Sequence, residues 1–440
     1  MTKKIRNKGF DLYQRAKNVI PGGNMLLSKR PEMFLPDYWP NYFSSAQNCT
    51  VTDLDGIAYT DMSIMGIGTN SLGYGNNKVD QAVRNVVETG NMSTLNCPEE
   101  VYLAEKLVEL HPWADMVKFA RTGGEANAIA IRLARAASGK NGVAICGYHG
   151  WHDWYLAANL RGQDDLGALL LPGLETVGVP ECLKELTHTF AYNDIEGLKE
   201  LTNENQIGVI IMEVKRNVEP KDQFLEKVRH LASEKGIVLI FDECTSGFRS
   251  CYGGLHKLYG VEPDLAMFGK ALGNGYAITA VIGKKSVMEY AQTSFISSTF
   301  WTERIGPAAG VATLDEMKMQ KSWKRTMDLG NYFRQKLEVN CDDVGLPVNI
   351  FGLESLPNFS FGDNNGLVLK TLFTQEMLKK GYLASTLFFA STAHSEKIID
   401  DFFETAYPIL DRLADCNKDP DLANKLLDGP ICHDGFKRLN

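Results

Sequence analysis

Two short segments of the chain place a carboxylate directly after one apolar run and an amine two residues beyond another. Asp242 follows the run 237–241, and Lys270 follows the run 265–268. Burial near other cations lowers the pKa of a lysine, and the neutral amine can then condense with an aldehyde. A carboxylate in such a place can hold a heteroaromatic ring nitrogen protonated, which makes the ring a better acceptor of carbanion electrons. Taken alone, Asp242 fits a turn or capping residue better than a functional one, and Lys270 fits a solvated loop lysine better.

A glycine turn upstream has a sequence that suits phosphate. Residues 121–125, Arg-Thr-Gly-Gly-Glu, join an expected strand to an expected alanine-rich helix. Free backbone N–H groups and the positive end of the helix dipole attract anions at such a corner. Thr122, Gly123 and Gly124 are therefore candidate phosphate ligands, although a Gly-Gly pair also serves a simple strand-to-helix corner.

An aromatic segment follows another apolar run. Residues 146–152 are Cys-Gly-Tyr-His-Gly-Trp-His. Tyr148 could stack on a flat heteroaromatic ring, whereas the alternative is that these aromatic residues pack in the core. A phosphate turn, a stacking aromatic residue, an aspartate and a lysine are four parts of one cofactor site, so their combination favours the functional interpretation over the separate structural ones.

The elements expected to position these residues form a doubly wound α/β structure. Between about 100 and 285, amphipathic helices alternate with short apolar runs, which is typical of parallel strands buried on both faces. Open sheets of this kind present ligand-binding groups at the carboxyl ends of their strands. The expected strands are 117–120, 143–146, 208–212 and 237–241, and the helices between them include 125–137 and 221–234.

The chain of 440 residues exceeds the usual size of one hydrophobic core, so two closely joined domains are expected. We expect an N-terminal segment, 1–65, that joins a small domain, a large cofactor-binding domain over 66–305, and a C-terminal small α+β domain over 306–440. The further expected elements are a helix over 9–20, two short strands within 50–61, one long helix from 305 towards 337, a strand over 356–361 and a helix over 395–414.

Composition excludes several classes of function. The net charge of −8 and the pI near 5.6 argue against a general nucleic-acid binder. The sequence has no apolar run of the length that a membrane span needs, and its basic N-terminus leads into polar residues, so we expect a cytoplasmic protein. The nine cysteines include no Cys-x-x-Cys pair, which favours reduced thiols and no metal site.

Taken together, these motifs resemble the class III aminotransferases of fold type I, especially the branch that includes the glutamate-1-semialdehyde aminomutases. The likeness covers most of the chain and implies a pyridoxal 5'-phosphate cofactor. The segments that carry it are 19–23, 122–126, 148–150, 242–243, 247–249, 269–273, 298–300 and 391–395.

The resemblance implies a role for each motif. Lys270 would form the Schiff base with the cofactor and shuttle protons, and Asp242 would partner the pyridine nitrogen. Tyr148 would cover the ring face, with His149 beside it in the same motif. The phosphate would be held by Thr122, Gly123 and Gly124.

Three further residues are assigned through the resemblance. A threonine at the position of Thr299 reaches the phosphate of the neighbouring subunit in such enzymes, which implies a homodimer with active sites at its interface. Glu213 and Asn217 match the family's Glu-Pro-Val-x-x-Asn segment only loosely, because Val214 replaces the proline and the spacing is shorter.

The choice of reaction depends on the substrate pocket. Residues 64–67 are Ile-Met-Gly-Ile where the aminomutases have Ser-Trp-Gly-Pro, and residues 385–387 are Ser-Thr-Leu where they have Phe-Glu-Ala. A changed pocket on a retained cofactor core favours an intermolecular aminotransferase that moves an amino group from an amino-acid donor, glutamate, to a small aldehyde or ketone. Residues 297–304 resemble aminotransferases of cell-surface polysaccharide pathways, and an 8-oxo-octulosonate for lipopolysaccharide is one such acceptor. The alternatives are an aminomutase-type isomerase and a non-catalytic regulator on the same fold.

Overall fold

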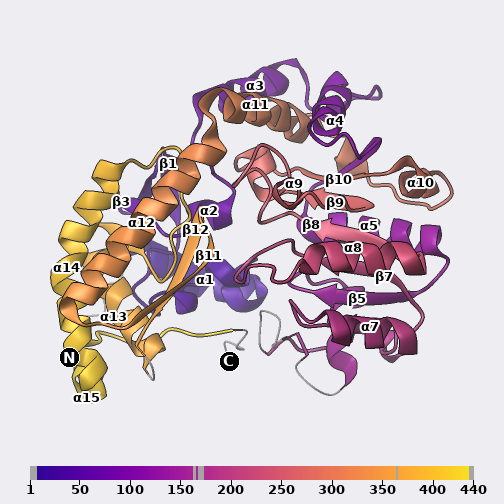
Figure 1. Cartoon of the computed structure of the whole chain (residues 1–440). Helices are drawn as coiled ribbons and strands as arrows, with labels where there is room; N and C mark the ends of the chain where they lie inside the picture. The colour runs from indigo at the N-terminus through magenta and orange to yellow at the C-terminus, as the bar shows by residue number, and fades with distance from the viewer. Residues whose placement is uncertain (1–6, 162–164, 167–172, 363–364, 436–440) are drawn as a thin grey trace. The chain divides into compact units, whose positions relative to one another are not determined.

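The computed structural model describes residues 7–161, 165–166, 173–362 and 365–435 (Figure 1). The chain divides into two compact units. The small unit combines Met1–Asn76 with Arg325–Asn440, and the large unit is Asn77–Lys324. All the residues assigned above to a cofactor site lie in the large unit, which is therefore described first.

A seven-stranded sheet forms the centre of the large unit, in the order β4-β10-β9-β8-β7-β5-β6. β10 runs antiparallel to both of its neighbours, and the other pairs are parallel. The predicted α/β fold with a mainly parallel sheet is confirmed. The strands are β4 (Met116–Ala120), β5 (Gly142–Cys146), β6 (Thr187–Thr189), β7 (Ile207–Met212), β8 (Val238–Asp242), β9 (Leu265–Phe268) and β10 (Thr279–Gly283).

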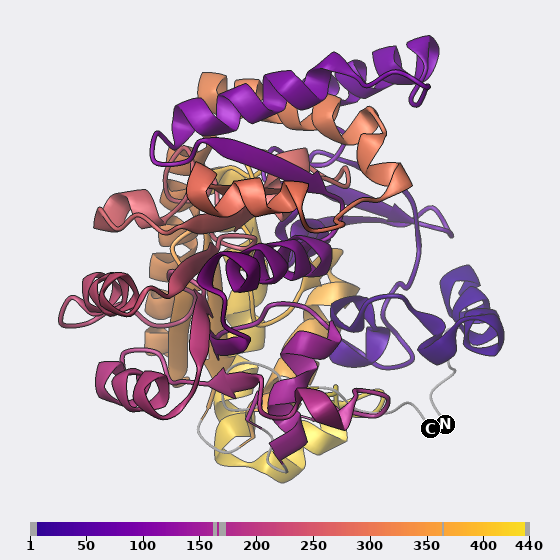
Figure 2. The same cartoon turned by 90° about the vertical axis from the view of Figure 1, so that its right-hand side faces the viewer.

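Helices cover both faces of this sheet. α5 (Gly123–Ser138) packs on one face against the central strands. α7 (Ile195–Glu204) and α8 (Phe224–Lys235) lie on the opposite face, as Figures 1 and 2 show. The other helices of the unit are α3 (Asn77–Thr89), α4 (Pro98–Leu110), α6 (Asp153–Leu156), α9 (His256–Tyr259), α10 (Lys285–Met288) and α11 (Ile305–Gln320).

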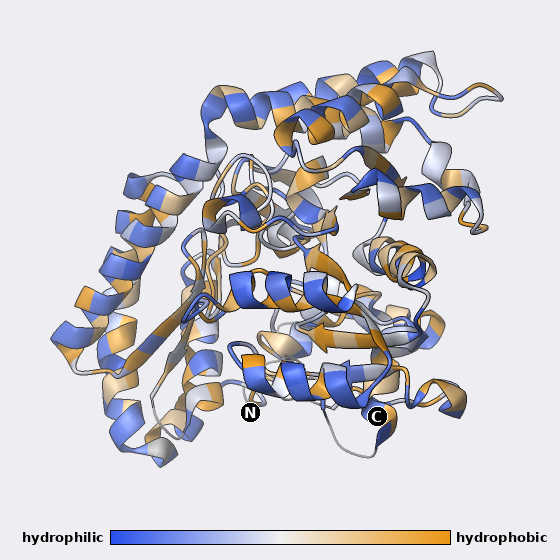
Figure 3. Cartoon of the chain, turned by 45° about the vertical axis from the view of Figure 1, so that its right-hand side comes forward, coloured by the Kyte–Doolittle hydropathy of each residue, from blue (hydrophilic) through white to orange (hydrophobic). Residues whose placement is uncertain are grey.

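Hydrophobic burial fixes the strands that end at the site. Every residue of β5, β7 and β8 is buried, and the strands of the large unit are mostly orange in Figure 3. Full burial of an apolar side chain such as Ile145 or Val209 contributes roughly 1.5–3 kcal/mol to stability. The carboxyl ends of these strands are therefore a rigid support for the loops that follow them.

The small unit has its own sheet and its own core. Its four-stranded sheet has the order β1-β2-β3-β13, and a separate hairpin is formed by β11 and β12. Phe333 stacks on Phe388 in the core, with a ring-centroid distance of 4.5 Å. The elements are α1 (Lys8–Val19), β1 (Phe43–Gln47), β2 (Thr50–Asp53), β3 (Ala58–Met62), α2 (Met65–Gly68), most of α12 (Ser322–Val344), β11 (Val348–Leu353), β12 (Leu356–Phe361), α13 (Gly366–Lys379), β13 (Tyr382–Ala384), α14 (Glu396–Lys418) and α15 (Pro420–Leu426).

The two units divide at 76/77 and 324/325, whereas the expected boundaries were 65/66 and 305/306. The Tyr74 amide donates to the Asn48 carbonyl at 2.7 Å and the Thr392 amide to that of Ser71 at 2.9 Å, so residues 66–76 belong with the small unit. α11 packs on α3 and α4 and therefore belongs with the large unit.

The prediction of a single long helix from 305 towards 337 is wrong. The structure has two helices, α11 and α12, separated at Lys321, whose φ is 50°. A left-handed residue ends the hydrogen-bonded ladder of the first helix. Neither glycine nor proline marks this position, so the sequence carried no signal for the break.

Two further features of the chain concern membrane spans and cysteines. Within the described residues, no helix is both long and apolar enough to cross a membrane. All nine cysteines are free thiols, and five of them are buried.

Candidate functional site

Asp242, the last residue of β8, is 3% exposed and is surrounded by hydrogen-bond donors. Its Oδ2 accepts from His149 Nδ1 at 2.8 Å and from Asn127 Nδ2 at 2.9 Å, and its Oδ1 accepts from the amide of Cys244 at 3.0 Å. Burial raises the pKa of this carboxyl, but the hydrogen bonds from His149, Asn127 and Cys244 outweigh burial and hold the pKa below its usual value. Asp242 is therefore a buried carboxylate that stays ionised.

Asn127 was missed by the sequence reasoning. It lies in the second turn of α5, and its Nδ2 also donates to the carbonyl oxygen of His149 at 3.0 Å. One side chain therefore ties α5 to both Asp242 and the 147–150 loop. The signal that could have found it is a buried polar residue within an alanine- and isoleucine-rich helix, because buried amides need hydrogen-bond partners.

Lys270 begins the turn that follows β9 and has a φ of 43°, which is rare for a residue with a side chain. Its Nζ donates to Thr245 Oγ1 at 2.7 Å. Burial lowers the pKa of the amine, and the charges of Arg216 and Arg249 lower it further, although the charge of Glu213 opposes them. Cys244 offers no compensating charge at neutral pH, because burial raises the pKa of its thiol to about 11. The strained backbone and the lowered pKa are features of a reactive lysine.

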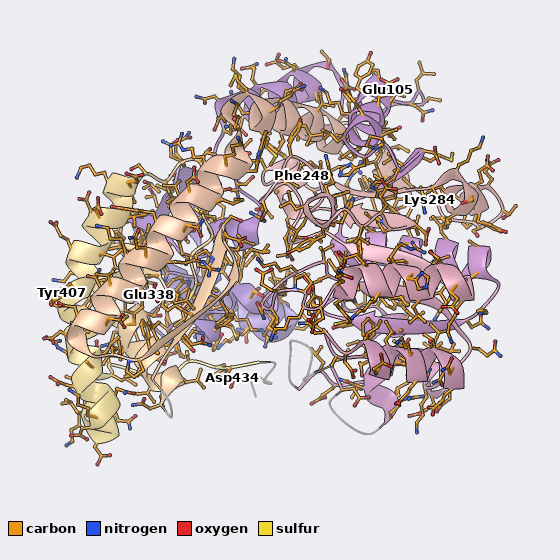
Figure 4. The ribbon with its side chains drawn as sticks, in the orientation of Figure 1. Glu105, Phe248, Lys284, Glu338, Tyr407 and Asp434 are labelled. Carbon is orange, nitrogen blue, oxygen red and sulfur yellow. The ribbon has the colours of Figure 1, made fainter. Side chains whose placement is uncertain are left out.

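The loop after β8 carries Thr245 and is held rigidly. Phe248, labelled in Figure 4, is 2% exposed, and its ring lies 5.3 Å from that of Phe268. The amide of Phe248 donates to the carbonyl of Gly253 at 2.8 Å. Thr245 is thereby presented to Lys270 from a fixed position.

The glycine turn forms the N-terminus of α5, as predicted. Thr122 is the N-cap, and its hydroxyl and the Glu125 carboxylate form a capping box. No acceptor for the amides of Gly123 and Gly124 is present in the described parts of the chain, so both are available to an anion. A Cβ on Gly124 would lie 2.7 Å from His152 Cε1, which only glycine avoids.

The turn, the aspartate and the lysine converge around Cys244. Its Sγ lies 3.3 Å from where a Cβ on Gly123 would be and 2.9 Å from the same position on Gly269. The Thr279 hydroxyl also donates to the carbonyl of Thr122, at 3.3 Å. Residues from three separate loops therefore surround one small region of the large unit.

Tyr148 adds a partly buried aromatic ring to this group. Its ring meets Tyr155 edge to face at 5.9 Å, which fixes the plane of the ring. Its amide donates to Glu213 Oε2 at 3.4 Å. Burial raises the pKa of the Tyr148 hydroxyl, so it stays protonated at neutral pH.

The remaining predicted residues differ in their placement. Glu213, directly after β7, is buried beside Tyr148 and accepts from Arg216 Nη1 at 2.9 Å and 3.2 Å. Asn217 is exposed on the same loop and makes no hydrogen bond with the described residues. Thr299 is exposed at the start of a short 3-10 helix, and the structure does not bring it to the other site residues of its own chain.

The residues present fit pyridoxal 5'-phosphate. An ionised, buried Asp242 suits a protonated ring nitrogen, and Lys270 supplies an amine for an aldehyde. The amides of Gly123 and Gly124 suit a phosphate at a helix N-terminus, in a corner where a Cβ on Gly124 would not fit.

Comparison with known proteins agrees with this fit. Residues 37–348 match the family described as aminotransferase class-III. A 3-aminobutyryl-CoA aminotransferase of Cloacimonas acidaminovorans (strain Evry) is 35% identical over 378 residues, which are 84% of this chain and 87% of that protein. A glutamate-1-semialdehyde 2,1-aminomutase of Methanococcoides burtonii is 32% identical over 92% of this chain and 98% of its own length.

Among solved structures, the PLP internal aldimine form of the FumI protein of Sphingopyxis sp. MTA144 has the same fold. The TM-score is 0.83 at 24% identity, over 94% of this chain and 99% of that one. The chain therefore belongs to the class III aminotransferase family, as a pyridoxal-phosphate-dependent enzyme of the transaminase type with the fold-type I architecture.

Proposed function

We propose that this enzyme transfers the amino group of an amino-acid donor, L-glutamate, to an aldehyde or ketone acceptor. One observation carries the proposal. The amine of Lys270, the carboxylate of Asp242 and the free amides of Gly123 and Gly124 converge within the large unit, and Asn127 and Cys244 tie their loops together.

Each of these residues has a task in that reaction. When bound, pyridoxal phosphate supplies an electron-accepting ring that stabilises negative charge on the carbon that loses a proton. Lys270 Nζ takes the proton from the substrate carbon as a general base and returns one as a general acid. Asp242 would keep the ring nitrogen protonated, because this carboxylate stays ionised in its buried setting. Tyr148 would cover one face of that ring.

The acceptor is proposed from the sequence together with the relatives. Residues 64–67 and 385–387 depart from the aminomutase motifs, which favours transfer between two different molecules. We propose an oxo acid as the acceptor, with an oxo sugar acid such as an 8-oxo-octulosonate as the first candidate. The relative that acts on 3-aminobutyryl-CoA adds 3-oxoacyl thioesters as a second class to be tested.

A product assay tests this function. The protein with its cofactor is incubated with L-glutamate and each acceptor in turn, and 2-oxoglutarate is measured with the aminated product. The proposal predicts equal amounts of the two products. Conversion of glutamate-1-semialdehyde to its isomer without any donor, and without release of an oxo acid, would instead identify an aminomutase. No turnover and no cofactor binding would identify the non-catalytic alternative.

We infer that the enzyme is a homodimer in which Thr299 completes the partner's site, because Thr299 is exposed at a position where such enzymes reach the phosphate of the neighbouring subunit. Nine free thiols suit a reducing compartment, and we propose the cytoplasm.

A further inference from the structure

The loop after β7 carries an arginine whose hydrogen-bonding capacity is only partly used. Arg216 donates to both carboxylate oxygens of Glu213, and both hydrogen bonds come from Nη1. Within the described residues, Nε and Nη2 have no acceptor. The Arg216 side chain is 31% exposed, whereas that of Glu213 is 8% exposed. The guanidinium is therefore held on one side and open to solvent on another.

Glu213 fixes this guanidinium beside the candidate site. Its Oε2 accepts from the amide of Tyr148 at 3.4 Å and lies 2.7 Å from where a Cβ on Gly147 would be. The charge of Arg216 lowers the pKa of both Lys270 and Tyr148, although burial is the larger influence on each. Arg216 and the amide of Tyr148 therefore share the Glu213 carboxylate, and the charge of Arg216 acts on the Lys270 amine.

Arginine binds a carboxylate through two parallel hydrogen bonds from one edge of its planar guanidinium. The edge of Arg216 formed by Nε and Nη2 offers such a pair. We propose that Arg216 binds the carboxylate of the amino-acid substrate through this edge, while Glu213 acts as a positioning residue that holds Nη1. This inference rests on the proposed function, because it assumes that the substrate is an amino acid bound beside Lys270.

A purely structural ion pair is the alternative. Loss of such a pair would leave the buried Glu213 carboxylate without its partner and lower stability, but it would affect substrates with and without an acid group alike. A carboxylate-binding arginine instead discriminates between substrates with and without the acid group. Binding of an unreactive carboxylate ligand measures this discrimination separately from activity.

Glutarate, which is glutamate without its amine, cannot react, so its affinity for the protein with bound cofactor measures carboxylate binding directly. We expect R216Q to weaken glutarate binding and to raise the KM for L-glutamate by about 10- to 100-fold, the range for a hydrogen bond to a charged group. R216K, which keeps the charge without the planar fork, should recover only part of the loss, and E213Q should give a smaller loss than R216Q.

Two controls make the result specific. The kcat/KM for 2-aminopropane, a donor with no carboxylate, should stay within about 2-fold in R216Q, since the lost interaction is worth little to that donor. R84Q, which removes an exposed arginine from α3, should change neither glutarate affinity nor the KM for glutamate. Unchanged glutarate affinity in R216Q, equal losses for both donors, or no binding of glutarate to the unmodified protein would each overturn the proposal.

The apoprotein gives a readout that is independent of the proposed function. The pKa of the Lys270 amine, followed by the pH dependence of its acetylation, should rise in R216Q and stay unchanged in R216K. Loss of glutarate binding in R216Q together with no transamination would refute the proposed function and leave the carboxylate site standing. Transamination by the unmodified enzyme, together with an unchanged Lys270 pKa and an unchanged glutarate affinity in R216Q, would refute the carboxylate site and leave the proposed function standing.

Discussion

Asn127 Nδ2 donates a hydrogen bond of 2.9 Å to Asp242 Oδ2 from the second turn of α5. The first turn of the same helix presents the free amides of Gly123 and Gly124. A single helix therefore sets the distance between the carboxylate that would hold the ring nitrogen and the amides that would hold the phosphate. Because both ends are fixed before the cofactor arrives, little reorganisation is needed on binding.

N127A should weaken both the site and the fold. Removing the amide deprives buried Asp242 of a donor, which costs about 1–3 kcal/mol of stability and about 10-fold in cofactor affinity. Urea unfolding of the apoprotein and titration with pyridoxal phosphate measure the two effects. N85A, which removes an exposed amide of α3 whose oxygen accepts from Gln81 Nε2, is the control and should leave cofactor affinity unchanged and stability within about 0.5 kcal/mol. Unchanged cofactor affinity in N127A would contradict the role assigned to this residue.

G124A should reduce cofactor affinity more than G123A. A Cβ at 124 would lie 2.7 Å from His152 Cε1, whereas a Cβ at 123 would lie 3.3 Å from Cys244 Sγ. The first contact forces the turn or the His152 ring to shift, and we expect a loss of about 10-fold or more in affinity for pyridoxal phosphate, measured by titration of the apoprotein. The double variant G124A/H152A removes the clash and should recover most of the loss. Equal effects of the two alanines would show that packing at Gly124 does not shape the phosphate site.

K270M should be inactive and yet more stable than the unmodified apoprotein at neutral pH. Burial holds the folded-state pKa of Lys270 below its ordinary value of 10.5, so the folded chain binds fewer protons than the unfolded chain between the two pKa values. The stability of the unmodified protein therefore rises with pH across that window, while the methionine variant lacks this contribution. The extra stability of K270M over the unmodified apoprotein should be largest below the folded-state pKa of Lys270 and should shrink towards pH 10. Urea unfolding at pH 7 and pH 10 checks the sign, and an advantage that grows with pH would refute it.

Mixed dimers test the assignment of Thr299. K270A should lose activity because it lacks the reactive amine. T299A should lose activity because each subunit no longer contacts the phosphate in its partner's site. After the two variants are mixed and allowed to exchange subunits, some dimers should contain one intact site, and activity should rise towards about a quarter of the unmodified level. No recovery in a mixture shown by mass spectrometry to contain mixed dimers would place Thr299 in the site of its own chain or in no site.

Much of this site could be predicted from the sequence, because strand, turn and helix chemistry is local. The apolar run before Asp242 and the glycines at 123 and 124 indicated a strand end and a helix N-terminus, and the structure has both. The mainly parallel sheet was predicted for the same reason, whereas the family was inferred from the resemblance of the motifs. The sequence did not show that residues 66–76 belong with the small unit. Their placement depends on contacts between residues as distant in sequence as Ser71 and Thr392.

The residues that were missed act through contacts distant in sequence. Asn127 reaches Asp242 across 115 positions, and Lys270 reaches Thr245 across 25. The apolar neighbours of Asn127 indicate that it is buried, but no local pattern shows which residue it contacts, and Thr245 carries no such signal. The helix break at Lys321 was missed because a left-handed lysine has no sequence signal of its own.

The central claim is that Lys270 forms a covalent bond with the aldehyde of pyridoxal phosphate. Borohydride reduction of the protein with its cofactor, followed by digestion and mass spectrometry, tests the claim directly. The account predicts a phosphopyridoxyl group on the peptide that contains Lys270 and on no other lysine-containing peptide. Labelling of a different lysine, or the absence of label on a protein that has bound the cofactor, would contradict it.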